Sequence, residues 1–372
     1  MGQAGPGISP AEPEQPDLPV PSPRSRQWFL SQAAWDDALV LTRFHELIRD
    51  NIGDRNGALV FLEKGLARRG VAAAGTAKQV MSPTGRVGNG QVWIFAVYVS
   101  RRGAAVVDMR LYIPREWFAD DYHKQRQACR FPAALDYKTK SEIVLTMLER
   151  IRSAAVLPCR FVQAALREET SGDFIDKLAK IKGVHYFQHL PRDARIWVTK
   201  IITWERRPLK WWLWYWYKKK VRARKIKRGT VRPWAFVRNL APRLWQQRPL
   251  PGDVTNSALD AFVRRRVPMS FGKNPPQVLW IMARRNAGRR PVYAYYISNA
   301  AAQTRLEVFT GLINAGEAAQ ACLGEFIATN RLTCCRGRTW PGLHRHFLIA
   351  MIAIFLCNRQ RTRSESDLAK VL

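Results

Sequence analysis

Cysteines, acidic residues and long apolar runs are all scarce in this chain of 372 residues. The six cysteines are irregularly spaced, which argues against a disulfide framework and favours a reducing compartment such as the cytoplasm. The longest apolar run, residues 347–357, is too short for a helix that crosses a bilayer. Residues 1–22 contain no lysine, no arginine and no apolar run, unlike a secretory signal. The sequence therefore predicts a soluble, cytoplasmic protein without a membrane partner.

The motifs of several enzyme classes are also missing. The chain contains no G-x-S-x-G elbow, no H-E-x-x-H pair and no phosphate-cradling G-x-x-x-x-G-K-[ST] loop. Cys334, Cys335, His344 and His346 lie close in sequence, but adjacent cysteines and an H-x-H pair do not match the spacing of a zinc site. We therefore expect neither ATP use nor bound zinc.

Positive charge is abundant. The chain has 61 Lys and Arg against 29 Asp and Glu, a formal net charge of +32, which predicts a polyanionic partner. The most basic segment, residues 203–245, is also rich in Trp and Tyr. Cationic side chains neutralise phosphates and aromatic rings stack on bases, so together they predict contact with nucleic acid. The expected contacts are Lys210, Lys218, Lys219, Lys220, Arg222, Arg224, Lys225, Lys227 and Arg228.

Two other interpretations of this aromatic-basic cluster remain open. Residues 211–220 combine a Trp-rich stretch with a lysine-rich flank, which also suits a helix lying on an anionic membrane. The aromatic residues could equally pack in an ordinary core. A second phosphate-binding candidate is the polar start of the last helix, where His344, Arg345 and His346 stand together.

The pattern of apolar residues predicts a mixed α/β fold in which a mixed sheet is flanked by helices. Strands are expected at 58–62, 91–100, 104–114, 159–165, 277–282 and 292–298, and helices at 141–154, 306–329 and 340–358. The predicted organisation is a disordered Pro-rich tail (1–27), an N-terminal helical segment (28–57), the first part of the core (58–202), a basic aromatic-rich insertion (203–276), the remainder of the core (277–358) and a polar tail (359–372).

Four stretches in this order resemble a known family. They are Ala58-Leu59-Val60 with the glycine-rich basic segment from Lys64 to Val92; Leu111-Tyr112-Ile113-Pro114 with Trp117, Asp120 and Asp121; Tyr295-Tyr296-Ile297 continuing to Ala318 and Cys322; and Trp340-Pro341-Gly342-Leu343-His344-Arg345-His346 before an apolar helix. Together they are similar to bacterial insertion-sequence transposases, whose RNase H-like core carries an Asp-Asp-Glu (DDE) triad. The resemblance implies DNA cleavage and joining by phosphoryl transfer with Mg²⁺ as the cofactor.

The acidic triad implied by the family is not found at the matching positions. The first Asp should follow Phe61, the second should follow Ala164, and the Glu should precede Cys322; the residues there are Leu62, Ala165 and Gln320. Leu and Ala cannot bind a cation and Gln offers only a neutral oxygen, so we expect a degenerate site without a cofactor. Mg²⁺ remains expected only if neighbouring acids compensate. These are Glu63, Glu168, Glu169, Asp173 and Glu325.

Glu63 is the least suited of these acids, because adjacent residues of a strand point to opposite faces of the sheet. The resemblance thus predicts a degenerate insertion-sequence transposase that binds the DNA ends of its element in the bacterial cytoplasm, at the nucleoid, with a homodimer on DNA as one arrangement. The alternative is a non-catalytic DNA-binding protein that retains the transposase scaffold.

Overall fold

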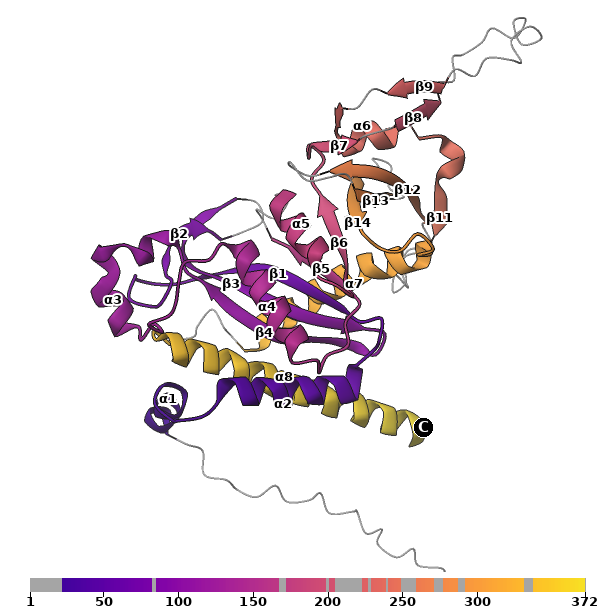
Figure 1. Cartoon of the computed structure of the whole chain (residues 1–372). Coiled ribbons are helices and arrows are strands. Elements are labelled where there is room, and N and C mark those ends of the chain that lie inside the picture. Colours follow the sequence, from indigo (N-terminus) through magenta and orange to yellow (C-terminus); the bar gives the residue numbers. More distant parts are fainter. Residues whose placement is uncertain are drawn as a thin grey trace, which may run out of the picture.

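The computed structural model describes residues 22–81, 85–166, 172–198, 201–204, 223–226, 229–238, 240–248, 259–270, 277–286, 292–330 and 337–371. Within these residues the fold is mixed α/β, as predicted (Figure 1). Most strands join one twelve-stranded sheet with the path β10-β7-β12-β13-β14-β6-β5-β1-β3-β2, to which β4 adds beside β3 and β11 beside β12.

Five strands form the core of this sheet in the spatial order β4-β3-β1-β5-β6. They are β1 (Ala58–Ala67), β3 (Val87–Ser100), β4 (Gly103–Tyr112), β5 (Phe161–Ala165) and β6 (His185–Leu190). β3 lies antiparallel to both β1 and β4, whereas β5 runs parallel to β1 and β6 runs parallel to β5. The predicted hairpin, helix and returning strand are therefore confirmed, and the arrangement is consistent with an RNase H-like core.

Helices cover both faces of the core. On one face lie α7 (Leu306–Thr329) and α8 (Trp340–Val371), and on the other lies α4 (Lys140–Ser153) (Figure 1). α4 begins at a capping box, in which Thr139 and Glu142 bond each other's backbone N–H groups. α7 buries a stripe of apolar side chains at helical spacing, including Phe309, Ile313 and Phe326, which fixes it to the sheet.

Shorter elements connect these layers. α2 (Asp37–Ile52) begins at Asp36, whose carboxylate accepts hydrogen bonds from the N–H groups of Ala38 and Leu39. The remaining elements of this half are α1 (Pro23–Ser31), β2 (Ala77–Val80), η1 (Arg115–Phe118), η2 (Asp120–Tyr122), α3 (His123–Ala128) and α5 (Gly172–Lys180). The sequence did not predict β2, α3, α5 or β6.

The insertion extends the sheet beyond β6. Its elements are β7 (Ile196–Val198), β8 (Ile201–Trp204), β9 (Ala223–Ile226), β10 (Gly229–Val231), α6 (Pro233–Arg238), η4 (Pro242–Leu244), β11 (Gln246–Arg248), β12 (Asp260–Ser270), β13 (Gln277–Arg285) and β14 (Tyr293–Ser298). β12 pairs with β13 along nearly its whole length, and β14 then pairs with β6. β13 and β14 thus continue the sheet from β12 to β6, α7 packs on the core strands, and the domain boundary at residue 276 stays a prediction.

Both predicted tails are shorter than expected. α1 begins at Pro23, inside the predicted disordered tail, because Ser22 caps it by accepting from the N–H group of Ser25. At the other end, the backbone of α8 continues to Val371 rather than ending at residue 358. Residues 340–360 of α8 are long and apolar enough to span a membrane by length and composition. In this fold, however, Leu343, Phe347 and Met351 are buried against the sheet, as in a core helix.

Candidate active site

The structure brings two of the three triad positions side by side. β1 and β5 are parallel neighbours, and Leu62 is the register partner of Ala165. Adjacent strands lie ~4.8 Å apart and register partners share a face, so carboxylates at these two positions could reach the same cations. Leu62 is buried at 4% exposure, whereas Ala165 is exposed at the end of its strand.

α7 crosses the face on which Leu62 and Ala165 lie. Phe95, the β3 partner of Leu62, contacts Phe326 of α7 with ring centroids 6.0 Å apart. Gln163, two residues before Ala165 and on the same face, donates from Nε2 to the Leu312 carbonyl oxygen at 2.6 Å. The helix passes so closely that a Cβ at Gly316 would lie 3.1 Å from Gln163 Oε1.

Gln320 lies one helical turn beyond Gly316 on α7 and is exposed. The third position matched to the triad is therefore on the helix that covers the first two. The three side chains at the matched positions are two hydrocarbons and one amide.

Glu63 points away from this face, as predicted. Its carboxylate Oε1 accepts a hydrogen bond from Lys140 Nζ of α4 at 2.6 Å, and both side chains are nearly buried. The Lys140 ammonium also lies 5.3 Å from the centre of the Tyr112 ring. Glu63 is thus held in an ion pair on the opposite side of the sheet and does not compensate for Leu62.

The other acids near the triad positions do not form a cluster in the part of the chain that the structure describes. Asp173 is exposed in the first turn of α5, and Glu325 is exposed on α7. Glu168 and Glu169 lie outside the described residues. Among the described residues, no group of three or more His, Cys, Asp and Glu side chains could hold a metal ion. The residues at the matched positions do not fit Mg²⁺.

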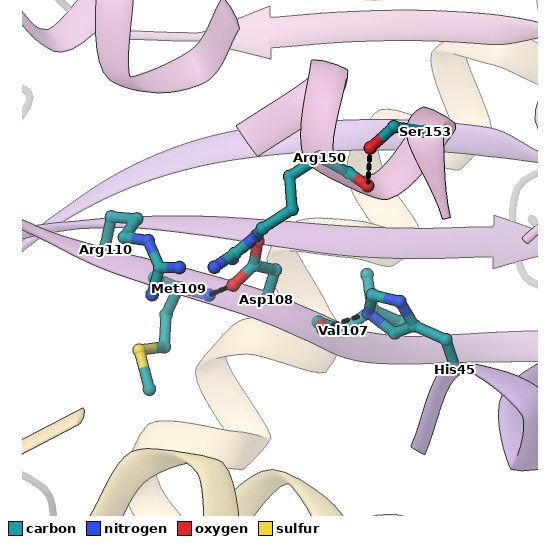
Figure 2. Close-up of polar contacts among 7 residues, drawn as sticks. All are labelled: His45, Val107, Asp108, Met109, Arg110, Arg150 and Ser153. Atoms are coloured by element: carbon teal, nitrogen blue, oxygen red, sulfur yellow. Dashed lines mark hydrogen bonds and ion pairs between the residues drawn. The ribbon is translucent and has the colours of Figure 1, made fainter. Parts of the chain in front are cut away.

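A buried charged pair lies on the same side of the sheet as Glu63. Asp108 in the middle of β4 forms an ion pair with Arg150 of α4, and its Oδ1 accepts from the Met109 N–H group at 2.7 Å (Figure 2). Asp108 is 1% exposed. Its partner Ala96 precedes Val97 at a β-bulge, where two residues of β4 face one of β3. The pair connects α4 to the sheet and is separate from the triad face.

His45 of α2 approaches the same strand. Its Nε2 lies 2.9 Å from the Val107 carbonyl oxygen and must carry the proton to donate to it (Figure 2). Burial lowers the pKa of His45. The hydrogen bond to Val107 and the charge of Asp108 act in the opposite direction, but their effect is smaller. Asp108, Arg150 and His45 were not predicted as functional residues, although a single acid inside the apolar stretch of residues 104–113 was a usable signal.

His344 and Arg345 have structural contacts rather than free surfaces for phosphate. His344 is buried, with its Nδ1 2.9 Å from the Trp340 carbonyl oxygen and its ring 5.4 Å from that of Trp93. Arg345 donates to Asp37 at 3.0 Å and to the Ala33 carbonyl oxygen at 2.8 Å, which fastens α8 to the N-terminal segment. A direct DNA contact by His344 does not fit this burial. His346 is half-buried beside Phe347.

Burial lowers the pKa of His344 to about 4, against the smaller opposing effect of its bond to Trp340. Because this folded-state pKa is below the unfolded value of 6.5, the folded protein keeps His344 neutral while the unfolded chain is protonated. We therefore expect the free energy of unfolding to fall by up to about 3 kcal/mol as the pH drops from 6.5 to 4, and no further below.

Urea unfolding across this pH range tests the His344 prediction. His344→Phe should reduce the slope of the free energy of unfolding against pH. The smaller contributions of His45 and His189, whose pKa values burial also lowers, should remain. His123→Gln, at an exposed position, should leave the slope unchanged. Equal slopes in wild type and His344→Phe would contradict the prediction.

Most of the expected basic contacts cannot be placed. Lys210, Lys218, Lys219, Lys220, Arg222, Lys227 and Arg228 lie outside the described residues, as do Trp211 to Tyr217. Arg224 and Lys225 belong to the backbone of β9, where they pair with Thr203 and Ile202 of β8. These two short strands lie at the far end of the insertion, and in the sequence they flank residues 205–222 (Figure 1).

Comparison with known protein families gives a match to the first part of the chain. A family model described as DDE superfamily endonuclease matches residues 18–200. No curated protein matches the chain. The matched residues include all five core strands, with Leu62 and Ala165 as neighbours on β1 and β5, and they end before α7. Over residues 18–200 the chain is therefore similar to the DDE superfamily of endonucleases, and this similarity supports a DDE-type transposase.

Proposed function

We propose that this chain is a degenerate insertion-sequence transposase, which binds DNA but does not cleave or join its strands. The observation that carries the proposal is the pair Leu62 and Ala165, adjacent in register on the face that α7 covers. Transposases of this superfamily would need cation-binding oxygens there, and a hydrocarbon supplies none.

The carboxylate closest to these positions among the described residues is already engaged. Glu63 is held by Lys140 on the opposite face, and a strand would have to slip by one residue to exchange Glu63 with Leu62. Such a slip would also move the apolar side chains of β1 out of the core. A phosphoryl-transfer step through these residues is therefore not expected.

DNA binding is supported by charge and by its distribution. The net charge is +32, and the described part of the insertion exposes arginines on several elements. They are Arg192, Arg195, Arg232, Arg238, Arg243, Arg248, Arg265 and Arg266. DNA ends of an insertion sequence are the proposed ligand, and the bacterial cytoplasm, at the nucleoid, is the proposed location. The same features suit a regulator that retains the transposase scaffold and competes with an intact enzyme.

The experiment measures duplex binding and nicking by the full chain. Lys219→Ala/Lys220→Ala should reduce the slope of log affinity against log salt by about 1.8, if both lysines contact phosphates. Arg101→Ala/Arg102→Ala, in the exposed turn between β3 and β4, provides a control with the same change of charge. Flotation with anionic vesicles under the same conditions tests the membrane alternative, which stronger vesicle binding than DNA binding would favour.

Nicking of a supercoiled plasmid that carries the element's ends should be absent with Mg²⁺ or Mn²⁺. Robust metal-dependent nicking would overturn the degenerate site. Testing Glu168→Ala, Glu169→Ala and Glu325→Ala would then identify a compensating acid, whereas persistence of nicking in all three would mean that the triad lies elsewhere.

A further inference from the structure

A cavity of about 960 Å³ lies in the insertion, where its lining strand β14 is separated from β5 by β6. It is lined by residues of α6 and η4, by Trp245 after η4, by Arg192 after β6, and by the paired ends of β13 and β14. Four aromatic side chains line it, Trp234, Trp245, Tyr293 and Tyr295. Trp245 meets Tyr293 edge to face at 6.2 Å, and Tyr293 stacks with Tyr295 at 6.5 Å.

Three arginines line the same cavity, and none of its lining residues is acidic. Arg285 lies 5.2 Å from the centre of the Trp245 ring, and Arg238 is exposed at the end of α6. Burial raises the pKa of Tyr295, and the charge of Arg192 partly opposes this effect. Within the described residues, Arg192, Arg238 and Arg285 have no carboxylate partner.

This lining selects a ligand that is both anionic and aromatic. Unpaired guanidinium groups attract phosphate, and ring faces bind the faces of bases. A cationic ligand would be repelled. A continuous duplex would present phosphates but not base faces, because its bases are stacked on each other. The cavity also falls within the roughly 300–1,000 Å³ of typical ligand pockets, which suits a nucleotide rather than a duplex.

We propose that this cavity binds an unpaired nucleotide of a DNA strand, with its base among Trp245, Tyr293 and Tyr295 and its phosphate at the arginines. The proposal rests on the proposed function, because it takes DNA as the ligand of the chain. It adds a second binding mode: the basic surface holds duplex, and the cavity holds a strand where pairing is broken.

The test uses the full chain and a fluorescent thymidine oligonucleotide, followed by anisotropy. Tyr293→Ala and Arg285→Ala should each weaken binding of this strand roughly tenfold. Arg101→Ala removes the same charge from the exposed turn between β3 and β4, and Trp28→Ala removes an exposed ring from α1, so both controls should bind as wild type does. Blunt duplex should bind all five proteins alike. Thermal unfolding of each variant verifies that the fold is intact.

Ligand controls separate the two halves of the nucleotide. An abasic oligonucleotide of the same length keeps the phosphates, and the wild type should bind it roughly tenfold more weakly than the thymidine strand. Equal binding of the abasic strand would overturn the role of the rings. If thymidine monophosphate competes as well as the oligonucleotide, the ligand is a free nucleotide, and the proposal that the cavity binds a nucleotide within a DNA strand is overturned.

The result also distinguishes this proposal from the proposed function. If Tyr293→Ala and Arg285→Ala bind the single strand as the wild type does, and all five proteins bind duplex, only the proposal for the cavity is overturned. Failure of the wild type to bind any DNA would overturn the proposed function and this proposal with it.

Discussion

Replacing Asp108 by alanine should destabilise the protein by about 3–5 kcal/mol, as expected when one partner of a buried ion pair is removed. Asp108 is 1% exposed, and its two carboxylate oxygens bond the Met109 N–H group and the Arg150 guanidinium (Figure 2). Alanine would leave the guanidinium beside an apolar strand without its counter-charge, and would also leave the Met109 N–H group unsatisfied. Urea unfolding at neutral pH measures the loss.

Two comparisons make the Asp108 result specific. Asp50→Ala removes a pair with Arg49 at 2.8 Å whose partners are both exposed, and should cost little stability because solvent screens both charges. Asp108→Leu/Arg150→Met removes both charges and should recover much of the loss, since well-packed apolar residues replace buried ion pairs with little cost. If Asp108→Ala cost no more than Asp50→Ala, the pair would have no role in holding α4 to the sheet.

Restoring carboxylates at the matched positions should make the protein respond to Mg²⁺. In Leu62→Asp/Ala165→Asp, the two acids would be register partners on one face of neighbouring strands. Without metal, loss of the buried leucine and repulsion between the carboxylates should lower the free energy of unfolding by roughly 3 kcal/mol or more. Mg²⁺ at ten times its dissociation constant should return about 1.4 kcal/mol.

Thermal unfolding with Mg²⁺ and with chelator measures this response. The wild type should unfold at the same temperature in both conditions. Leu62→Asn/Ala165→Asn, which has similar volume but no charge, should be destabilised without any response to Mg²⁺. Adding Gln320→Glu should strengthen the response if α7 carries the third position. No response in the double Asp variant would mean that these positions are not those of the family's metal site.

Local sequence patterns predicted much of the core correctly. The hairpin of β3 and β4, the helix α4, the strand β5 and the long helix α7 follow from apolar periodicity, a capping box and turn residues, all of which act between near neighbours. The predicted division at residue 276 separates β12 from β13, because the sequence does not state which strands pair. Pairing of β12 with β13 is a contact between separate segments, and its choice depends on the whole sheet.

Composition and residue identity alone determined that the chain is strongly cationic and that Leu62, Ala165 and Gln320 cannot act as acids, because charge and donor atoms belong to the side chains themselves. Only the tertiary structure decided where such side chains lie. It buries His344, directs Glu63 to Lys140, and assembles four rings and three arginines from α6, η4, β13, β14 and their loops into one cavity. Burial and convergence arise from packing between distant segments, which no local pattern specifies.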